Sequence, residues 1–315
     1  MMVFALIFTM AACTDGKDTE TETETTTSYV RENKTKVAVY SGITSLGVSK
    51  LVRDRDYAYE SSMYTDLGEI ESLLKNGGTD IAAVPVEFAA KIYNDTKGGV
   101  KIISINNLGA LYLVSDDTDI KSLADIGDKT VYASGKGTAF EHILNFIFEK
   151  NSIKPRIEYV ATDAELATLA IEGKADLCIL PEPIATKVVF ENREMKRVVD
   201  FAAEWKAASG SGLAQTVIVA RTEYIEKNPE YINTFLSQNE ISVNFLVDNT
   251  DTGANLLHKD NYFSSVDLAR ACLPNCKLYF IKGDEMKPLV QSVCDALPAE
   301  MTGGTVNADG ICFVQ

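Results

Sequence analysis

The sequence predicts an α/β protein built from two similar lobes that are joined by a hinge with two crossings. The first observation is length: the chain has 315 residues, and a domain usually holds about 100–200 residues. The second is an internal repeat, because residues 67–85 reappear in similar form at residues 163–181. The third is an alternation of predicted strands and helices, which is typical of a parallel-rich sheet with helices on both faces.

Each copy of the repeat combines a helix, a glycine, a buried strand and a proline. The copies read LGEIESLLKNGGTDIAAVP and DAELATLAIEGKADLCILP, so that Gly77 aligns with Gly173 and Pro85 with Pro181. Apolar residues at helical spacing predict a helix that ends at the glycine. The apolar run after it is typical of a strand buried on both faces. The proline suits the first position of a new helix. Two copies therefore predict two lobes of similar build.

A further strand and helix are predicted before each copy. Strand 37–40 runs into Ser41 and Gly42, and a helix follows at about residues 46–52. Strand 130–133 runs in the same way into a Ser-Gly pair, and a helix follows at residues 139–151. Both lobes thus begin with the same order of elements.

The rest of the chain sets the predicted domain boundaries. Apolar strands are expected at 101–105 and 111–115, and the last part of the chain is mostly helical with no copy in the second lobe. We therefore expect the last part to return to the first lobe. The prediction is one lobe of residues 35–115 plus 216–315 and a second of 116–215, with crossings near 114–119 and 211–217. A hinge between similar lobes forms a cleft that closes on a ligand.

The N-terminal residues predict export and a lipid anchor. Residues 3–12 are an apolar run, shorter than the roughly 20 residues that span a bilayer. The run ends in Met-Ala-Ala-Cys13, which resembles a bacterial lipobox, although no basic residue precedes it. This resemblance implies a signal peptide at 1–12 and acylation of Cys13. Residues 13–34 would form the lipidated, Thr/Glu-rich tether, on the outer face of the cytoplasmic membrane.

Composition disfavours several other functions. The net charge of −15 and pI of about 4.7 are unfavourable for binding nucleic acid or an anionic membrane surface. The only histidines, His142 and His258, belong to no catalytic motif. Besides Cys13 there are five cysteines, and Cys272 and Cys276 lack the other ligands of a zinc site. Disulfides and buried free thiols both remain open. We expect no catalytic residue, cofactor or metal.

Three segments carry a family resemblance. GTDIAAVPVEFAAKIYND, GKADLCILPEPIATKV and SGKGTAFEHILNF, with the order of the lobes, resemble type II periplasmic binding proteins. They are most similar to the nitrate/sulfonate/taurine and thiamine-precursor group of ABC importer solute-binding lipoproteins. The resemblance covers about residues 35–300. It implies a small-molecule ligand between the lobes, an ABC permease as partner, and a monomer. It leaves a sulfonate, a nitrate-like anion and a pyrimidine or aromatic amine open as ligands.

The alternative function is an enzyme of the same two-lobed fold, similar to a menaquinone-pathway dehydratase, or a ligand-binding sensor. The predicted lipobox and tether argue against a cytoplasmic enzyme.

The candidate ligand-binding residues follow strands, where open α/β sheets collect ligands, and precede helices, whose N-termini favour anions. Hydroxyl groups and backbone amides would donate hydrogen bonds, Lys136 would pair with an anion, and Glu87 or Glu182 would pair with an amine. The same residue types also serve as helix caps or first-turn carboxylates, and Trp205 suits either ligand stacking or packing near the hinge. The candidate residues are Gly42, Ile43, Thr44, Ser45, Pro85, Glu87, Asn107, Gly135, Lys136, Gly137, Thr138 and Glu182.

Overall fold

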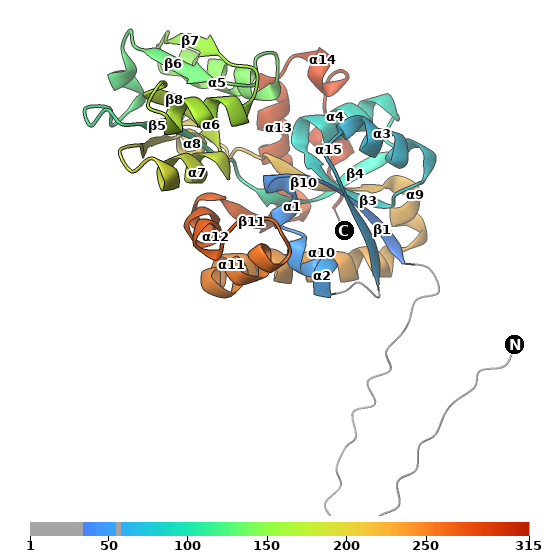
Figure 1. Ribbon diagram of the computed structural model, residues 1–315. Coiled ribbons are helices and arrows are strands. Elements are labelled where there is room, and N and C mark those ends of the chain that lie inside the picture. Colours follow the sequence, from blue (N-terminus) through green and yellow to red (C-terminus); the bar gives the residue numbers. More distant parts are fainter. Residues whose placement is uncertain (1–33, 55–57, 315) are drawn as a thin grey trace, which may run out of the picture.

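The computed structural model describes residues 34–54 and 58–314, which form two α/β lobes (Figure 1). Each lobe is built around one sheet. The predicted fold class is therefore confirmed. The predicted signal peptide, Cys13 and nearly all of the tether lie outside the described residues. Among the described helices, none combines the length and the apolar character needed to cross a membrane.

The first lobe contains a six-stranded mixed sheet in the order β11-β4-β10-β3-β1-β2. Strand β1 pairs in parallel with β2 and β3, whereas β10 lies antiparallel between β3 and β4. Alternate residues of β3 face opposite sides, with Ala82 in one buried cluster and Ala83 in another, as expected for a strand covered on both faces. The strands are β1 (Thr35–Tyr40), β2 (Tyr59–Tyr64), β3 (Ile81–Pro85), β4 (Val100–Asn107), β10 (Thr216–Arg221) and β11 (Leu278–Ile281).

The helices of this lobe come from both ends of the described chain. The N-terminal ones are α1 (Ile43–Leu46), α2 (Ser49–Asp54), α3 (Leu67–Asn76) and α4 (Val86–Asp95). The C-terminal ones are α9 (Thr222–Lys227), α10 (Pro229–Asp248), α11 (Thr250–Lys259), α12 (Val266–Cys272), α13 (Met286–Ala296), α14 (Ala299–Thr302) and α15 (Ala308–Ile311), with short 3-10 turns at Leu273–Asn275 and Gly283–Glu285.

The second lobe contains a five-stranded sheet in the order β7-β6-β8-β5-β9. Its strands are β5 (Leu111–Ser115), β6 (Thr130–Ala133), β7 (Arg156–Tyr159), β8 (Leu177–Pro181) and β9 (Lys196–Asp200). Its helices are α5 (Ala139–Lys150), α6 (Asp163–Ile171), α7 (Ile184–Glu191) and α8 (Phe201–Ser209), with a 3-10 turn at Leu123–Ile126.

The repeat seen in the sequence forms the same helix–strand–helix unit in both lobes. Helix α3 ends at Gly77, whose φ of 78° is left-handed, and Gly173 after α6 has a φ of 69°. A left-handed residue is favourable there because glycine has no Cβ to clash. The buried strands β3 and β8 follow these glycines, and α4 and α7 follow the strands. The predicted similarity of the lobes is thus visible element by element.

Strand β5 lies in the second sheet, so the predicted boundary at residue 115 and the crossing near 114–119 are wrong. Val114 of β5 pairs with Cys178 of β8, and β9 flanks β5 on its other side. The first crossing instead runs through 108–110, immediately after β4, and Gly109 turns there with φ 78°. All five residues of β5 are buried, so their apolar pattern fits the interior of either sheet. The return crossing runs through 210–215.

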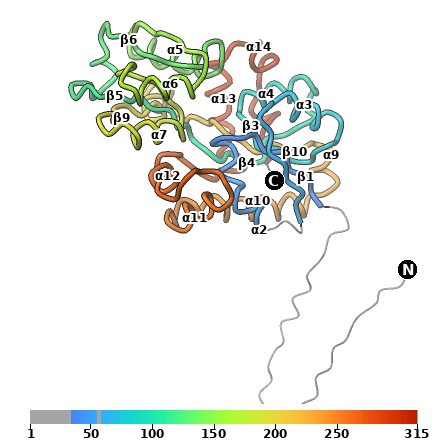
Figure 2. The backbone as a smooth tube through the Cα atoms, viewed as in Figure 1, coloured from blue at the N-terminus to red at the C-terminus, as the bar shows by residue number. Residues whose placement is uncertain are grey.

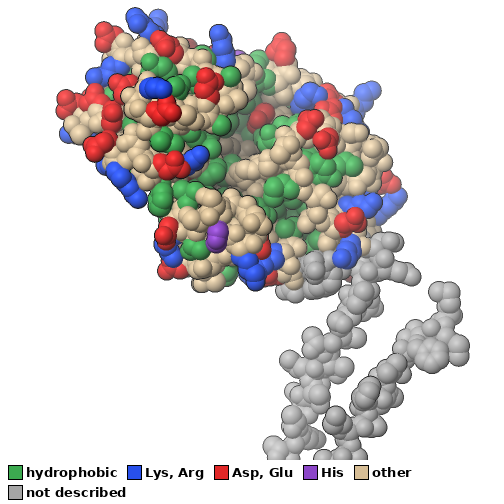
Figure 3. All heavy atoms as spheres, in the orientation of Figure 1, with side chains coloured by type: hydrophobic (Ala, Val, Ile, Leu, Met, Phe, Trp, Pro, Cys, Tyr) green, Lys and Arg blue, Asp and Glu red, His purple; other side chains and the backbone are tan. Residues whose placement is uncertain are grey.

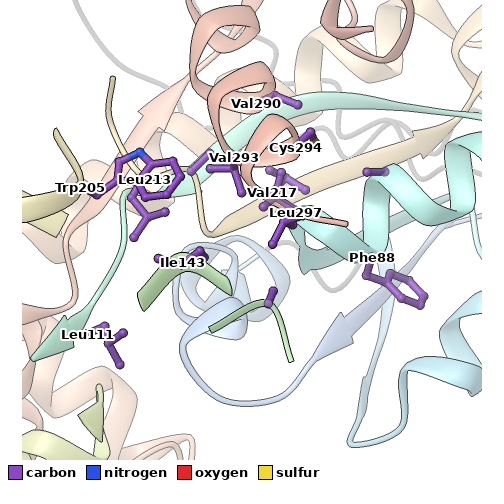
Figure 4. Close-up of a cluster of buried hydrophobic side chains, with 14 of the residues drawn as sticks. Phe88, Leu111, Ile143, Trp205, Leu213, Val217, Val290, Val293, Cys294 and Leu297 are labelled. Carbon is purple, nitrogen blue, oxygen red and sulfur yellow. The ribbon is translucent and has the colours of Figure 1, made fainter. Parts of the chain in front are cut away.

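One buried hydrophobic cluster extends through both lobes. It joins Val84 of β3 to Leu113 of β5 through residues of the return crossing and of helix α13, including Leu213 and Val293 (Figure 4). Helix α13 contacts α4 in one lobe and α5 in the other, and the tube view shows it beside the junction of the lobes (Figure 2). Helix α12 likewise contacts α7 of the second lobe.

Candidate ligand-binding cleft

A cavity of about 400 Å³ lies between the lobes, and both lobes line it. The space-filling view shows the hollow between them, with hydrophobic side chains around it (Figure 3). The first lobe and the return crossing contribute Tyr40, Ser41, Gly42, Ile43, Thr44, Pro85, Val86, Glu87, Ala214, Gln215 and Thr216, and the second lobe contributes Ala139, Phe140, Ile143, Asp163, Pro181, Glu182, Pro183 and Ile184.

The lining is built at the carboxyl ends of strands. β1 leads into the segment 40–44, β3 leads into Pro85 and α4, and β8 leads into 181–184 and α7. Parallel strands bring such ends to one edge of their sheet, where ligands of open α/β folds bind. At 42 the chain has a φ of 83°, which glycine adopts without strain. The repeated strand-to-helix units therefore supply opposite walls of one cavity.

Six of the candidate residues line this cavity: Gly42, Ile43, Thr44, Pro85, Glu87 and Glu182. They come from the ends of β1, β3 and β8, and they include both glutamates. The residues at the ends of β1 and β3 lie in the first lobe, and Glu182, at the end of β8, lies in the second. The structure thus brings together side chains that are far apart in the sequence.

The other six candidates, Ser45, Asn107, Gly135, Lys136, Gly137 and Thr138, do not line the cavity. The Ser45 and Thr138 hydroxyls turn back and donate hydrogen bonds to the backbone carbonyls of Gly42 and Gly135, at 2.7 and 2.6 Å. The Lys136 ammonium lies over the ring of Tyr159, 5.7 Å from its centroid. The two hydroxyls thus stabilise their own loops, and the Lys136 side chain lies against the end of β7.

Asn107 and Trp205 are both buried and contact other parts of the protein instead of the cavity. The Asn107 side chain is buried, donates a hydrogen bond to the carbonyl of Cys276 and accepts one from the amide of Gly109 at 3.1 Å. Asn107 therefore shapes the first crossing. Trp205 is fully buried, and its ring packs against Phe146 with centroids 4.9 Å apart. Of its two interpretations, packing is the one that the structure supports.

Glu182 is buried at the edge of the cavity and is held by an ion pair. Its Oε1 accepts hydrogen bonds from Nε and Nη2 of Arg197, at 3.0 and 2.5 Å, and its Oε2 accepts from the amide of Thr186 at 3.0 Å. Only 2% of the residue is exposed. The carboxylate of Glu182 is thus neutralised within the chain, which leaves it little capacity to pair with a ligand amine.

Glu87 differs, because no basic side chain pairs with it among the described residues. It lies in the first turn of α4 and faces the cavity. Burial raises the pKa of its carboxyl to about 7, while a hydrogen bond from its own backbone amide opposes the rise. Glu87 therefore changes charge near neutral pH.

The thiols are free in the described part of the chain. Cys178, Cys272, Cys276, Cys294 and Cys312 are buried and form no disulfide. The sulfur atoms of Cys272 and Cys276 are 3.4 Å apart, and the Cys272 thiol lies 3.6 Å from Oε2 of Glu182. Among the described residues, no group of three or more His, Cys, Asp or Glu side chains is arranged to hold a metal ion.

Sequence reasoning missed the apolar walls and the contribution of the return crossing. Phe140 and Ile143 line the cavity from α5, and Gln215 lines it from the return crossing. Gln215 also links the two crossings. Its backbone amide donates to the backbone carbonyl of Asn107 at 3.2 Å, and its side-chain Oε1 accepts from the backbone amide of Ala110 at 2.9 Å. The signal for Phe140 was its place at the start of a helix that follows a glycine-rich loop. Gln215 carried no local signal.

Comparison with known proteins identifies the family. Residues 63–252 match the sequence model of the NMT1/THI5-like family. The chain belongs to the NMT1/THI5-like family. This NMT1/THI5-like protein matches no curated protein sequence, so the further comparisons are with solved structures.

Those solved structures share the fold of this NMT1/THI5-like protein. An ABC transporter protein from Parabacteroides distasonis has a TM-score of 0.76 at 20% identity, covering 89% of this chain and 98% of its own. The periplasmic aliphatic sulphonate binding protein SsuA from Escherichia coli has a TM-score of 0.66 at 15% identity, covering 84% and 91%. A putative periplasmic sulfonate-binding protein from Methylobacillus flagellatus has a TM-score of 0.65 at 14% identity, covering 90% and 93%. The fold is that of the periplasmic binding proteins.

Proposed function

We propose that this protein is an extracytoplasmic solute-binding protein that captures a small molecule between its lobes and delivers it to an ABC importer. The observation that carries the proposal is the cavity lined by both lobes. A ligand that touches both lobes binds the closed form more tightly than the open form, so it shifts the population toward closure. Closure then marks the loaded protein for the permease.

Two further observations support binding without catalysis. The residues that line the cavity include no histidine, cysteine or lysine, so the lining holds neither a Ser–His nor a Cys–His pair of the kind used in covalent catalysis. The solved structures with this fold include components described as parts of ABC transport systems. Capture and release of an unchanged solute need only a shaped cavity and a hinge.

Closure is tested by small-angle X-ray scattering. The protein is purified under native conditions, and mass spectrometry identifies any small molecule that remains bound. We expect the radius of gyration to fall when this molecule is added back to the stripped protein. A molecule that binds tightly while the scattering curve stays unchanged would contradict a closing cleft.

We also propose that Cys13 carries the lipid anchor and that residues 14–34 connect it to the first lobe. The support is the lipobox-like segment and the Thr/Glu-rich composition of residues 14–34. Incorporation of labelled palmitate should be lost in Cys13→Ala and retained in Thr14→Ala, which leaves the cysteine in place. Equal labelling of the two variants would place the lipid elsewhere.

A further inference from the structure

We propose that the cleft takes a small organic cation with an apolar body, such as a protonated amine or amidine, and rejects sulfonates and other strong anions. The N–H groups of the ligand would face the carboxylates of Glu87 and Asp163. This inference rests on the proposed function as a solute-binding protein and adds the chemical class of the solute.

The charges that line the cavity are all acidic. Glu87, Asp163 and Glu182 line it, and no arginine, lysine or histidine does. Arg197 neutralises Glu182 from outside the lining, so two carboxylates remain without a basic partner on the cavity wall. In a partly dehydrated cleft such charges attract a cation and repel an anion more strongly than they would in water. An anionic ligand would enter this site without any basic side chain to receive it.

The starts of α4, α6 and α7 at the cavity are occupied by carboxylates of the chain itself, whereas the four-residue helix α1 has no acidic residue in its first turn. A helix N-terminus ordinarily favours an anion through its free amides and its dipole. Here the chain places its own carboxylates there: Glu87 is in the first turn of α4, and Asp163 is in the first turn of α6. The Glu182 carboxylate accepts from the Thr186 amide at the start of α7.

In the loop before α5, a carboxylate of the chain again occupies a backbone amide near the start of a helix. The carboxylate of Glu141 accepts a hydrogen bond from the amide of Gly137 at 2.6 Å. Lys136, the basic residue of that loop, lies over the Tyr159 ring and not in the cavity lining. The groups that would make this loop an anion site are therefore already engaged.

The remaining wall suits an apolar body. Phe140, Ile143, Val86 and Ile184 contribute aliphatic and aromatic surface, and Tyr40 adds a second aromatic ring. Aromatic faces attract organic cations in addition to covering their apolar parts. A cavity of about 400 Å³ lies near the lower end of the range for small-molecule sites. The wall thus matches a compact molecule with one polar end.

Glu87, which has no basic partner among the described residues, also favours a cationic ligand. It is half-buried at the cleft, and its partial loss of solvation raises the pKa of its carboxyl to about 7. A buried carboxylate is stabilised when an opposite charge approaches it. The groups around the cleft that carry charge are Asp163 and the Glu182–Arg197 pair, and the Cys294 thiol also lies close enough to interact with Glu87 electrostatically. None of them provides an unpaired positive charge.

The test compares pairs of probes that share the same carbon skeleton and carry either an ammonium or a sulfonate group. The pairs are benzylamine with phenylmethanesulfonate and butylamine with butanesulfonate, each added at millimolar concentration to the full-length protein while the melting temperature is measured. We expect the amines to raise the melting temperature and the sulfonates to leave it unchanged. Equal or greater stabilisation by the sulfonates would overturn the inference.

Variants assign the effect to the cleft. Glu87→Gln should weaken amine binding at least tenfold by titration calorimetry. The control Glu69→Gln makes the same change in the first turn of α3, on an exposed residue away from the cavity, and should leave binding unchanged. Unchanged amine affinity in Glu87→Gln would refute the assignment. If no amine binds at all, the inference fails, whereas the scattering experiment with the co-purified molecule still decides the proposed function.

Discussion

Arg197, which is half-buried, and Glu182, which is buried, form an ion pair in which the carboxylate depends on the guanidinium. Removal of Arg197 would leave a carboxylate with 2% exposure and no counter-charge. Such a change destabilises a protein by about 3–5 kcal/mol. We therefore expect Arg197→Met to lower the free energy of unfolding by that amount in urea titrations. The double variant Glu182→Gln/Arg197→Met removes both charges and should recover most of the loss. A double variant as unstable as the single one would show that packing of the arginine stem matters more than charge.

Glu87 makes stability depend on pH in the opposite sense to a paired carboxylate. Its pKa is about 7 in the folded protein against an ordinary 4.5, so between these values the folded state binds more protons than the unfolded state. The free energy of unfolding contributed by this residue therefore decreases as pH rises from about 4.5 to 7. Glu87→Gln should be more stable than the wild type at pH 8, by up to about 3 kcal/mol, and equal to it below pH 4.5. Chemical unfolding at both pH values measures the difference, and a variant less stable at pH 8 would contradict it.

The sequence locates the loops of the site but not the direction of each side chain. Thr44 and Ser45 are neighbours of the same chemical type, yet Thr44 lines the cavity and the Ser45 hydroxyl bonds to the Gly42 carbonyl. The difference is set by the phase of one short helix, which no composition rule fixes. Lys136 is similar, because its flexible stem allows it to reach the Tyr159 ring instead of the cleft. Loop positions follow from strand ends, whereas side-chain direction follows from tertiary contacts.

At the scale of elements, the two helix-ending glycines should behave alike. Gly77 and Gly173 have φ of 78° and 69°, where a Cβ costs about 1 kcal/mol or more. We expect Gly77→Ala and Gly173→Ala each to lower the free energy of unfolding by about 1 kcal/mol. The control is Gly68→Ala, since Gly68 lies within α3 and has no positive φ. Its new Cβ would lie 3.2 Å from Oδ1 of the Asp66 side chain, which can shift, so alanine should cost less there than at Gly77. Denaturant titrations compare the three, and similar losses at Gly68 and Gly77 would rule out backbone conformation as the cause.

The elements themselves were predictable to different degrees. The repeated strands β3 and β8 follow from apolar runs between a glycine and a proline, which is a strong local signal. Strand β5 was predicted as a strand, but it was assigned to the first lobe and lies in the sheet of the second. All of its residues are buried, so its sequence has no alternation of polar and apolar residues that would indicate which sheet it joins. Sheet membership depends on pairing with strands such as β8 that lie far along the chain.

At the scale of the whole molecule, the two crossings touch at Gly109 and Leu213. A Cβ at position 109 would lie 2.7 Å from Cδ2 of Leu213, and the backbone there has φ 78°. Gly109→Ala should therefore push the crossings apart, lower stability by more than about 1 kcal/mol, and weaken binding of the co-purified molecule. Gly109→Ala/Leu213→Ala removes the two closest contacts, with Cδ2 and Cγ of Leu213, but keeps the one with its Cβ at 3.1 Å, and should restore binding in part. Binding of the single variant with wild-type affinity would show that the hinge tolerates this separation.

The hydrophobic cluster that passes through α13 has a consequence for how the protein unfolds. Lobes linked only by two chain crossings would melt independently, giving two heat-absorption peaks. Here Leu213, Val293 and their neighbours belong to one buried cluster with residues of both sheets, so one lobe cannot lose its packing without exposing apolar surface of the other. We expect the lobes to melt in a single peak whose calorimetric and van't Hoff enthalpies agree. Proteolysis after partial heating would then release no folded single lobe, since helix α13 packs on both lobes and makes them one cooperative unit.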